Sequence, residues 1–195
     1  AIQISSDNNN LFYNNIYLKY NPVYKQETTT LWETRLDTTI QSMPFLVTNH
    51  YTRAKEIFVQ DEANNIYLTS GTGKILWKRR LTEKIISEVV QVDALKNNKL
   101  QMLFNTSSFI FLVDRNGKDV TGFPIMLKAA ATNEISVFDY DKNKNYRILV
   151  ACNDGKVYNY EINGKPVEGW EFPKLKSPVK HAFRFFSLDG NDYLV

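Results

Sequence analysis

The nonapeptide GKILWKRRL, residues 73–81, decides the fold of this chain, because related stretches recur along it at a fixed spacing. TTTLWETRL precedes it and PVEGWEFPKL follows it, each with a tryptophan in similar surroundings, and DVTGFPIML carries a phenylalanine in the same place. The four rings lie 45, 46 and 47 residues apart, at Trp32, Trp77, Phe123 and Trp170. A constant spacing of this length indicates internal structural repeats.

Two further features keep the same period. The dipeptide Gly-Lys recurs at residues 73–74, 117–118 and 164–165, with spacings of 44 and 47. The centres of four apolar triplets step by 45, 46 and 45 residues, at Phe58, Leu103, Leu149 and Leu194. The pentapeptide NNIYL also occurs twice, at Asn14–Leu18 and Asn64–Leu68. Three features with one period establish that the chain is built from duplicated units.

Each unit consists of short runs rich in Val, Ile, Phe and Tyr, separated by turns such as Asn-Gly and Asp-Gly. Such turns join antiparallel strands, and four strands in about 45 residues are typical of a β-propeller blade. Apolar residues at helical spacing are missing throughout. Pro124 cannot donate a ladder hydrogen bond, which assigns the ring-bearing segment to the outer strand. We therefore expect each ring to pack between adjacent blades, and NNIYL to be a third strand in which Tyr17 and Tyr67 match Phe111 and Tyr158.

The predicted fold class is all-β, a partial β-propeller of four-stranded antiparallel blades. The period places complete blades at about 38–82, 84–128 and 133–173, with partial blades at 1–37 and 178–195. The final apolar run, DYLV, ends where earlier copies continue, which predicts part of a larger propeller or sheet edges closed by a partner. The first and last segments of one chain would complete one blade, or two copies would pair edge to edge as a homodimer. We favour an arc that is open within one chain.

Composition narrows the classes of function. With 195 residues, 43% of them hydrophobic, the chain can bury a core, and its formal charge of +3 is spread along its length. The longest basic cluster, Lys78-Arg79-Arg80, is too small for a nucleic-acid surface. The single cysteine, Cys152, excludes an internal disulfide and lies in an apolar run, which predicts a buried, inert thiol. Neither a stretch of membrane-spanning length nor a signal-peptide pattern is present in this sequence.

The sharpest candidate for a metal site is DYDKNKN, which places oxygen ligands at alternate positions, on Asp139, Asp141, Asn143 and Asn145. Short loops wrap Ca²⁺ with this alternation. Lys144 stands where a glycine would permit the turn, and Val150 replaces the bidentate acid. We therefore interpret the segment as a solvated hairpin turn, with calcium as the alternative ligand. No other cofactor is predicted.

Three stretches carry a resemblance to a known family. YLTSGTGKILW, residues 67–77, resembles the repeat of quinoprotein-like propellers, in which a Thr-Gly-Lys turn precedes the tryptophan. FLVDRNGKDVTGFPI and NYEINGKPVEGWEF resemble the Asn-Gly-Lys variant of extracytoplasmic bacterial propellers. The resemblance spans residues 11–195 and implies a periplasmic or extracellular location. Many family members are quinone enzymes, but His50 and His181 occupy different places in their repeats, and no catalytic residue is predicted.

We interpret the chain as a non-catalytic binding or scaffold module, part of a larger bacterial envelope protein, that presents loops to protein or glycan. Loop aromatics that would anchor such a ligand are Phe12, Tyr20, Tyr24 and Tyr51. One alternative is a fragment of a quinone-dependent or sugar-processing enzyme whose active site lies elsewhere. A third is an envelope-assembly protein that binds partners by edge-strand addition. Absorbance of a bound quinone would separate the enzyme from the other two.

Overall fold

The computed structural model describes residues 2–6, 12–16, 30–40, 42–189 and 191–195. Contacts divide the chain into two units, Ala1–Leu31 and Trp32–Val195, which are considered separately. In the first unit β1 (Ile2–Ser6) and β2 (Phe12–Ile16) form an antiparallel hairpin with Ile2 opposite Ile16. Tyr17, Tyr20 and Tyr24 lie outside the described residues.

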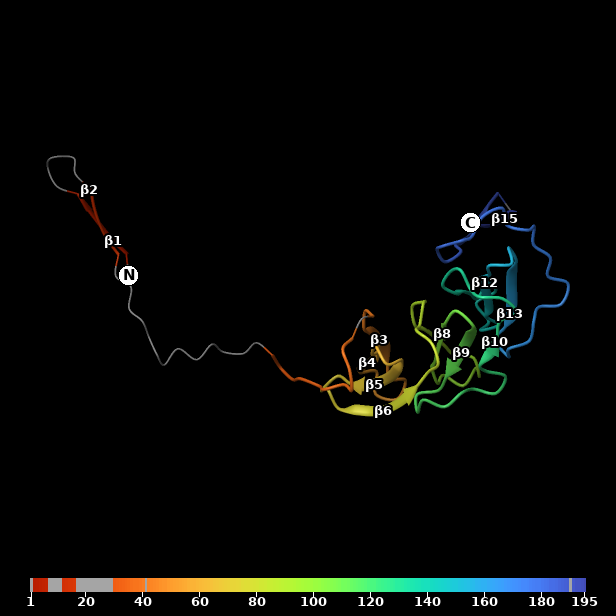
Figure 1. Cartoon of the computed structure of the whole chain (residues 1–195), viewed down its shortest axis with the longest axis horizontal. Helices are drawn as coiled ribbons and strands as arrows, with labels where there is room; N and C mark the ends of the chain where they lie inside the picture. The colour runs from red at the N-terminus through yellow and green to blue at the C-terminus, as the bar shows by residue number, and fades with distance from the viewer. Residues whose placement is uncertain (1, 7–11, 17–29, 41, 190) are drawn as a thin grey trace. The chain divides into compact units, whose positions relative to one another are not determined.

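The second unit contains two four-stranded sheets in which neighbours along the chain pair antiparallel (Figure 1). The strands of the first sheet are β3 (Phe45–Thr48), β4 (Lys55–Gln60), β5 (Asn65–Ser70) and β6 (Ile75–Arg80). Those of the second are β7 (Val90–Val92), β8 (Gln101–Asn105), β9 (Phe109–Val113) and β10 (Ile125–Met126). NNIYL at residues 64–68 lies in the third strand of its sheet, as predicted.

A third sheet and a hairpin complete the described strands. The third sheet contains β11 (Ser136–Phe138), β12 (Arg147–Ala151) and β13 (Val157–Glu161), and the hairpin contains β14 (Phe185–Leu188) and β15 (Asn191–Leu194). No helix that could span a membrane occurs among the described residues. Successive four-stranded antiparallel sheets, with no helix among the described residues, confirm the predicted all-β fold of a partial β-propeller.

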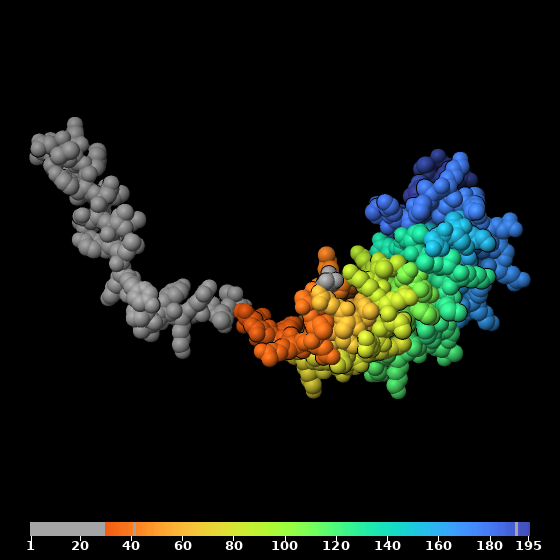
Figure 2. All heavy atoms as spheres, in the orientation of Figure 1, coloured from red at the N-terminus to blue at the C-terminus, as the bar shows by residue number. Residues whose placement is uncertain are grey.

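The hydrophobic core lies between consecutive sheets. Alternate side chains of β9 point to opposite faces, so Phe111 and Val113 pack against the first sheet with Phe58. Ile110 and Leu112 pack in a different cluster with Ile148 and Val150 of the third sheet. The middle sheet is therefore buried on both faces, which explains its nearly continuous apolar strands. In Figure 2 the same succession is visible as bands of colour from orange to blue.

Two of the outer rings, Trp32 and Trp77, pack against the turn of the following sheet. A Cβ added to Gly117 would lie 2.8 Å from Cδ2 of Trp77, and the indole Nε1 of Trp77 donates to the carbonyl of Arg115 at 2.7 Å. A Cβ on Gly73 would lie 2.5 Å from Cε3 of Trp32 in the same way. The prediction that rings pack between blades is confirmed for Trp77, which contacts Phe58 of its own sheet and Arg115 and Gly117 of the next. Trp32 contacts the Gly-Lys turn of the first sheet, so in both cases the glycine of the Gly-Lys turn meets the ring of the preceding unit.

The outer segment of the third sheet differs from the predicted strand over residues 165–172, because only an isolated bridge pairs Tyr160 with Pro166. Hydrogen bonds fix the segment at both ends, from Val167 N to Asn159 O and from Leu175 N to Gly155 O, and residues 168–174 lie between them. The matching bonds of the second sheet run from Val120 N to Leu112 O and from Leu127 N to Ser108 O, with residues 121–126 between them. The outer segment of the third sheet therefore has one more residue between its two anchoring hydrogen bonds than the outer segment of the second sheet has.

That extra residue, together with Pro173, which has no N–H, prevents regular pairing along β13. The Nε1 of Trp170 instead donates to the carbonyl of Val157 in its own sheet, at 2.9 Å. Trp170 therefore does not repeat the setting of Trp32 and Trp77, which corrects the expectation that all three are equivalent. Its ring stacks on Phe172, with centroids 6.0 Å apart and an interplanar angle of 18°.

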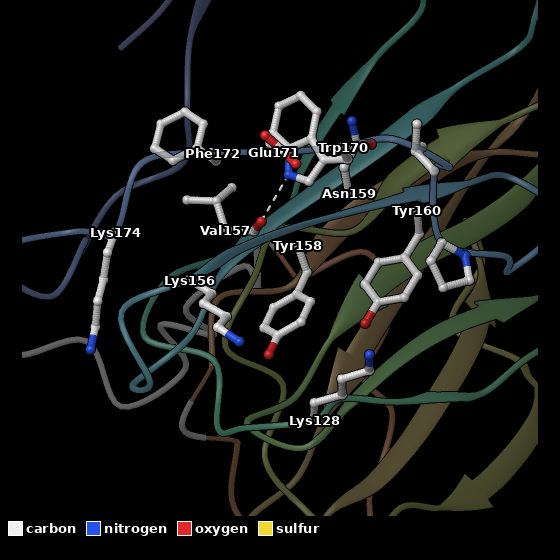
Figure 3. Close-up of a pocket in the computed structure, with 12 residues that line it drawn as sticks. Lys128, Lys156, Val157, Tyr158, Asn159, Tyr160, Trp170, Glu171, Phe172 and Lys174 are labelled. Carbon is white, nitrogen blue, oxygen red and sulfur yellow. Dashed lines mark hydrogen bonds between the residues drawn. The ribbon is translucent and has the colours of Figure 1, made fainter.

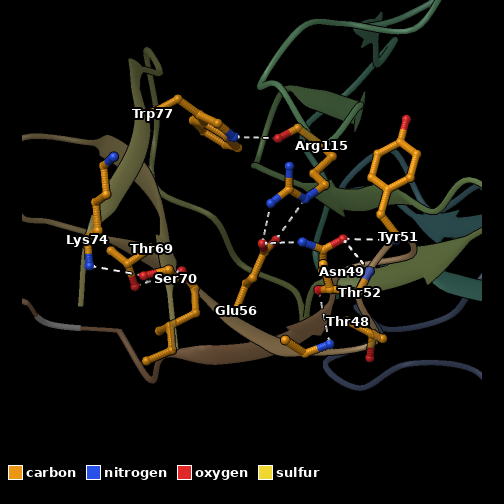
Figure 4. A network of polar contacts seen from close by, with 12 residues as sticks. Thr48, Asn49, Tyr51, Thr52, Glu56, Thr69, Ser70, Lys74, Trp77 and Arg115 are labelled. Atoms are coloured by element: carbon orange, nitrogen blue, oxygen red, sulfur yellow. Dashed lines mark hydrogen bonds and ion pairs between the residues drawn. The ribbon is translucent and has the colours of Figure 1, made fainter. Parts of the chain in front are cut away.

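Polar side chains also join the first sheet to the second (Figure 4). The guanidinium of Arg115 forms an ion pair with Glu56, whose side chain is 6% exposed, and Nδ2 of Asn49 donates to the same carboxylate at 2.9 Å. The amide oxygen of Gln60 accepts from the backbone of Ile85 at 2.8 Å, and the second and third sheets are joined in the same manner by Asn105. These bonds satisfy backbone donors of the segments that connect one sheet to the next.

Candidate functional site

The predicted calcium residues lie in the turn between β11 and β12. One oxygen of Asp139 accepts the backbone N–H groups of Asn143 and Lys144, each at 3.0 Å. Oδ1 of Asn143 accepts the N–H of Asn145, at 2.9 Å. These bonds are those of a hairpin turn closed by its own side chains. In the part of the chain that the structure describes, no three His, Cys, Asp or Glu residues are grouped as a metal site. Calcium binding stays a prediction, and calorimetric titration with Ca²⁺ tests it.

The other residues considered from the sequence are dispersed. Nδ1 of His50 accepts the backbone N–H of Leu100 at 3.1 Å, and burial, aided by Arg115, lowers the pKa of His50. The carbonyl of His181 accepts from Asn133. Cys152 is 1% exposed, and burial raises the pKa of its thiol to about 12, which confirms a buried thiol and agrees with an inert one. Tyr51 is 67% exposed, in the turn after β3.

A hollow of about 500 Å³ lies along the outer edge of β13, where the irregular segment leaves the strand (Figure 3). Its volume is within the usual range for ligand sites in proteins. We call it the β13 groove and define it by the residues that determine its chemistry: Tyr158, Asn159, Tyr160, Trp170, Phe172 and the lysines at 128, 156 and 174. The groove exists because residues 168–174 bow away from β13 between their two anchoring hydrogen bonds.

Aromatic rings form both walls of the β13 groove. Tyr158 and Tyr160 extend to one side of β13, while Trp170 and Phe172 lie on the other side with Val157 (Figure 3). The hydroxyl of Tyr158 donates to Oδ2 of Asp154 at 2.7 Å, and burial followed by this hydrogen bond raises the pKa of Tyr158. Burial also raises the pKa of Tyr160. Both phenols therefore keep their protons at neutral pH and present apolar ring faces.

The rim of the groove is charged. Lys128, Lys156 and Lys174 are exposed and line the hollow together with one acidic residue, Glu171. Lys128 comes from the end of the second sheet's outer segment, so two sheets contribute to the rim. An apolar interior with a cationic rim is the arrangement expected of a site for a partly apolar, anionic ligand.

Asn159 contributes an unsatisfied acceptor. Its side chain is 7% exposed, and Oδ1 has no hydrogen-bond partner among the described residues, a state shared only with Nε2 of His50. Asn159 and Trp170 also line a second hollow of about 270 Å³, on the side of β14 and β15, with Arg147, Phe185 and Tyr193. A buried polar atom without a partner costs free energy, and a ligand donor at this point would recover it.

A larger hollow, about 740 Å³, lies where the turns of the second and third sheets meet, but its two carboxylates are already engaged. Both oxygens of Asp119 accept from Arg79, at 2.7 and 2.8 Å. Oδ1 of Asp114 accepts two backbone N–H groups of its own turn. Its lining backbone is tight as well, because a Cβ on Gly122 would lie 2.4 Å from the carbonyl oxygen of Asn163. The β13 groove is the stronger candidate.

Sequence reasoning did not identify the β13 groove. The sequence does carry a signal for it: Pro173, which has no N–H, follows the tryptophan closely and indicates an outer segment that cannot repeat the pairing of its neighbours. Of the loop aromatics predicted as anchors, Tyr51 does not line the groove, and the side chains of Phe12, Tyr20 and Tyr24 lie outside the described part of the structure.

Comparison with known proteins gives limited information. No family model and no curated protein matches the chain. Two similar solved structures are crystal structures of BBS1N in complex with ARL6DN, soaked with lead and with mercury. The first is 14% identical with a TM-score of 0.44, covering 72% of this chain and 56% of that chain. The second is 16% identical with a TM-score of 0.40, covering 67% and 53%. The chain thus spans about half the length of the structures it matches.

These findings correct one expectation and leave others without support. The periplasmic or extracellular location followed from the quinoprotein-like resemblance alone, and it is wrong on this comparison, because the similar structures are of BBS1N with ARL6DN. The coarser part of the resemblance, a β-propeller, is confirmed by the sheets described above. The quinoprotein assignment has no matching family model.

Proposed function

We propose that this chain is a β-propeller module that binds another protein, and that the β13 groove is its binding site. The observation that carries the proposal is the groove itself, an aromatic hollow of about 500 Å³ next to a buried asparagine oxygen that lacks a partner. Sheets buried on both faces hold β13 rigidly, and rigid scaffolds that position irregular segments are well suited to recognition.

The aromatic content supports a protein ligand. Tyrosine and tryptophan are enriched at protein interfaces because they offer large apolar area with few rotatable bonds. Three such rings and Phe172 line the β13 groove, and an exposed polar rim surrounds them, which is the usual anatomy of an interface. Edge-strand addition, one of the binding modes considered from the sequence, fits a groove beside an incompletely paired strand.

Selection from a random dodecapeptide display library tests the proposal. Peptides selected on the intact chain should lose at least about fivefold in affinity for Trp170→Ala, because an aromatic anchor at an interface typically contributes more than about 1 kcal/mol. Tyr51→Ala, which removes an exposed ring outside the groove, is the matched control and should leave affinity unchanged. Circular dichroism establishes that each variant is folded. Peptides that bind the intact chain and Trp170→Ala equally would refute the groove as the site.

A further inference from the structure

We infer that the ligand of the β13 groove is an acidic, extended protein segment, one of whose backbone N–H groups donates to Oδ1 of Asn159. This inference rests on the proposed function and adds the chemical class of the partner. Three observations carry it independently: the charge of the rim, the unsatisfied acceptor and the interrupted strand edge.

The rim favours carboxylates. Lys128, Lys156 and Lys174 oppose a single acid, Glu171, around a hollow whose interior is apolar. Exposed charges contribute modestly to affinity, but they strongly affect the association rate and the specificity for a partner. An acidic segment is therefore selected over a neutral or basic one. The formal charge of the whole chain is only +3, so a cationic excess at this rim is a local feature.

The acceptor favours an amide donor. Asn159 lines both hollows, and its buried Oδ1 has no partner among the described residues. A peptide backbone supplies an N–H donor at every residue except proline. A carboxylate, phosphate or sulfate alone offers only acceptors to this atom. A peptide that carries acidic side chains satisfies both the lysines and the asparagine, which a simple anion does not.

The strand edge favours an extended conformation. In the second sheet, Ile125 of the outer segment pairs with Ile110 of β9. The equivalent place beside Val157 of β13 is instead reached by the indole Nε1 of Trp170. A short extended segment therefore lies along the groove beside Trp170, which keeps its hydrogen bond to Val157, and directs its apolar side chains toward Trp170 and Phe172.

The test uses acetylated pentapeptides in which leucine alternates with either glutamate or lysine, titrated into the isotopically labelled intact chain. We expect only the glutamate peptide to shift the amide resonances of Val157, Tyr158 and Asn159. The double variant Lys156→Glu, Lys174→Glu should weaken this binding about tenfold, as two exposed ion pairs are lost. Lys118→Glu changes an exposed lysine in the turn after β9, outside the residues that line the groove; it is the control and should bind as the parent does.

Two further arms address the acceptor and rival ligands. N-methylation of the glutamate peptide removes its N–H donors and should weaken binding at least fivefold, whereas Asn159→Val should bind both forms equally. Equal shifts with the lysine peptide would overturn the acidic class while leaving the proposed function in place. A heparin fragment that displaces the peptide and binds more tightly, or light scattering showing a dimer with these amides buried, would also overturn the inference. If neither pentapeptide binds, the inference fails, and the display selection decides separately whether the groove binds protein.

Discussion

Gly117→Ala should destabilise the chain by far more than Gly169→Ala, although both glycines have similar backbone conformations. Gly117 has φ +79° and Gly169 has φ +72°, a region that costs an alanine about 1 kcal/mol. A Cβ on Gly169 would meet no atom within 4 Å, so this variant isolates the backbone cost. A Cβ on Gly117 would lie 2.8 Å from Cδ2 of Trp77, well inside van der Waals contact.

The ring of Trp77 has little freedom to yield. Its Nε1 donates to Arg115 O at 2.7 Å, and its ring meets Phe58 edge to face, with centroids 6.1 Å apart. Displacing it loses about 1 kcal/mol of hydrogen bond and about 1 kcal/mol of aromatic packing. We therefore expect about 3 kcal/mol for Gly117→Ala and about 1 kcal/mol for Gly169→Ala.

Urea unfolding followed by far-ultraviolet circular dichroism measures both losses. With a slope of about 2 kcal/mol per molar urea, the midpoints should fall by about 1.5 M and about 0.5 M. In a Trp77→Ala background, Gly117→Ala should cost only the backbone term, about 1 kcal/mol. Equal losses of unfolding free energy for the two glycine variants in the parent chain would refute the idea that packing of the Trp77 ring on Gly117 stabilises the contact between the two sheets.

Three other outcomes follow from buried polar and sulfur groups. Arg115→Met leaves the carboxylate of Glu56 buried without its ion partner and should cost about 3 kcal/mol in urea unfolding, of which Glu56→Gln in the same chain should restore a large part. Burial alone would raise the pKa of Asp93, but hydrogen bonds from Lys144 and two turn amides outweigh it and hold the pKa below the usual 3.8. Asp93 therefore stabilises the fold above that value, and the contribution is lost as pH falls through the lower folded pKa; thermal melts of Asp93→Asn should lack this acid-dependent loss. Cys152, with its pKa raised to about 12, should react with Ellman's reagent at pH 8 only after denaturant is added, and rapid reaction of the native chain would contradict its burial.

The periodic features of the sequence predicted the fold because each one corresponds to a repeated physical contact. The glycines of the first two Gly-Lys turns, Gly73 and Gly117, meet the rings of the preceding units, Trp32 and Trp77, so glycine and ring recur with one period. Pro124 marked the outer segment correctly, because a residue without an N–H is tolerated at a sheet edge. The predicted equivalence failed at Trp170, which lies within a segment that has one more residue than its counterpart in the second sheet.

The candidate site was much less accessible to sequence reasoning than the fold. The apolar strand segments and the turn residues are local features that appear in every repeat, whereas the β13 groove arises from the one repeat that departs from the pattern. Gln60 and Asn105 bridge successive sheets through bonds to Ile85 and Ile135, and their different spacings, 25 and 30 residues, conceal the shared role. A polar atom that lacks a partner, as in Asn159, is defined only by its surroundings.

The sequence by itself determined that this chain is a succession of antiparallel sheets with an aromatic ring at each outer segment. The strand segments, the turn residues and the repeat length can all be recognised along the linear sequence. Only the tertiary structure decided that Trp170 turns back to Val157, and that a groove with tyrosines, lysines and an unsatisfied asparagine opens beside β13. The reason is geometric. Whether an outer segment pairs with its neighbour depends on hydrogen bonds at both of its ends, and these join residues that no local pattern relates.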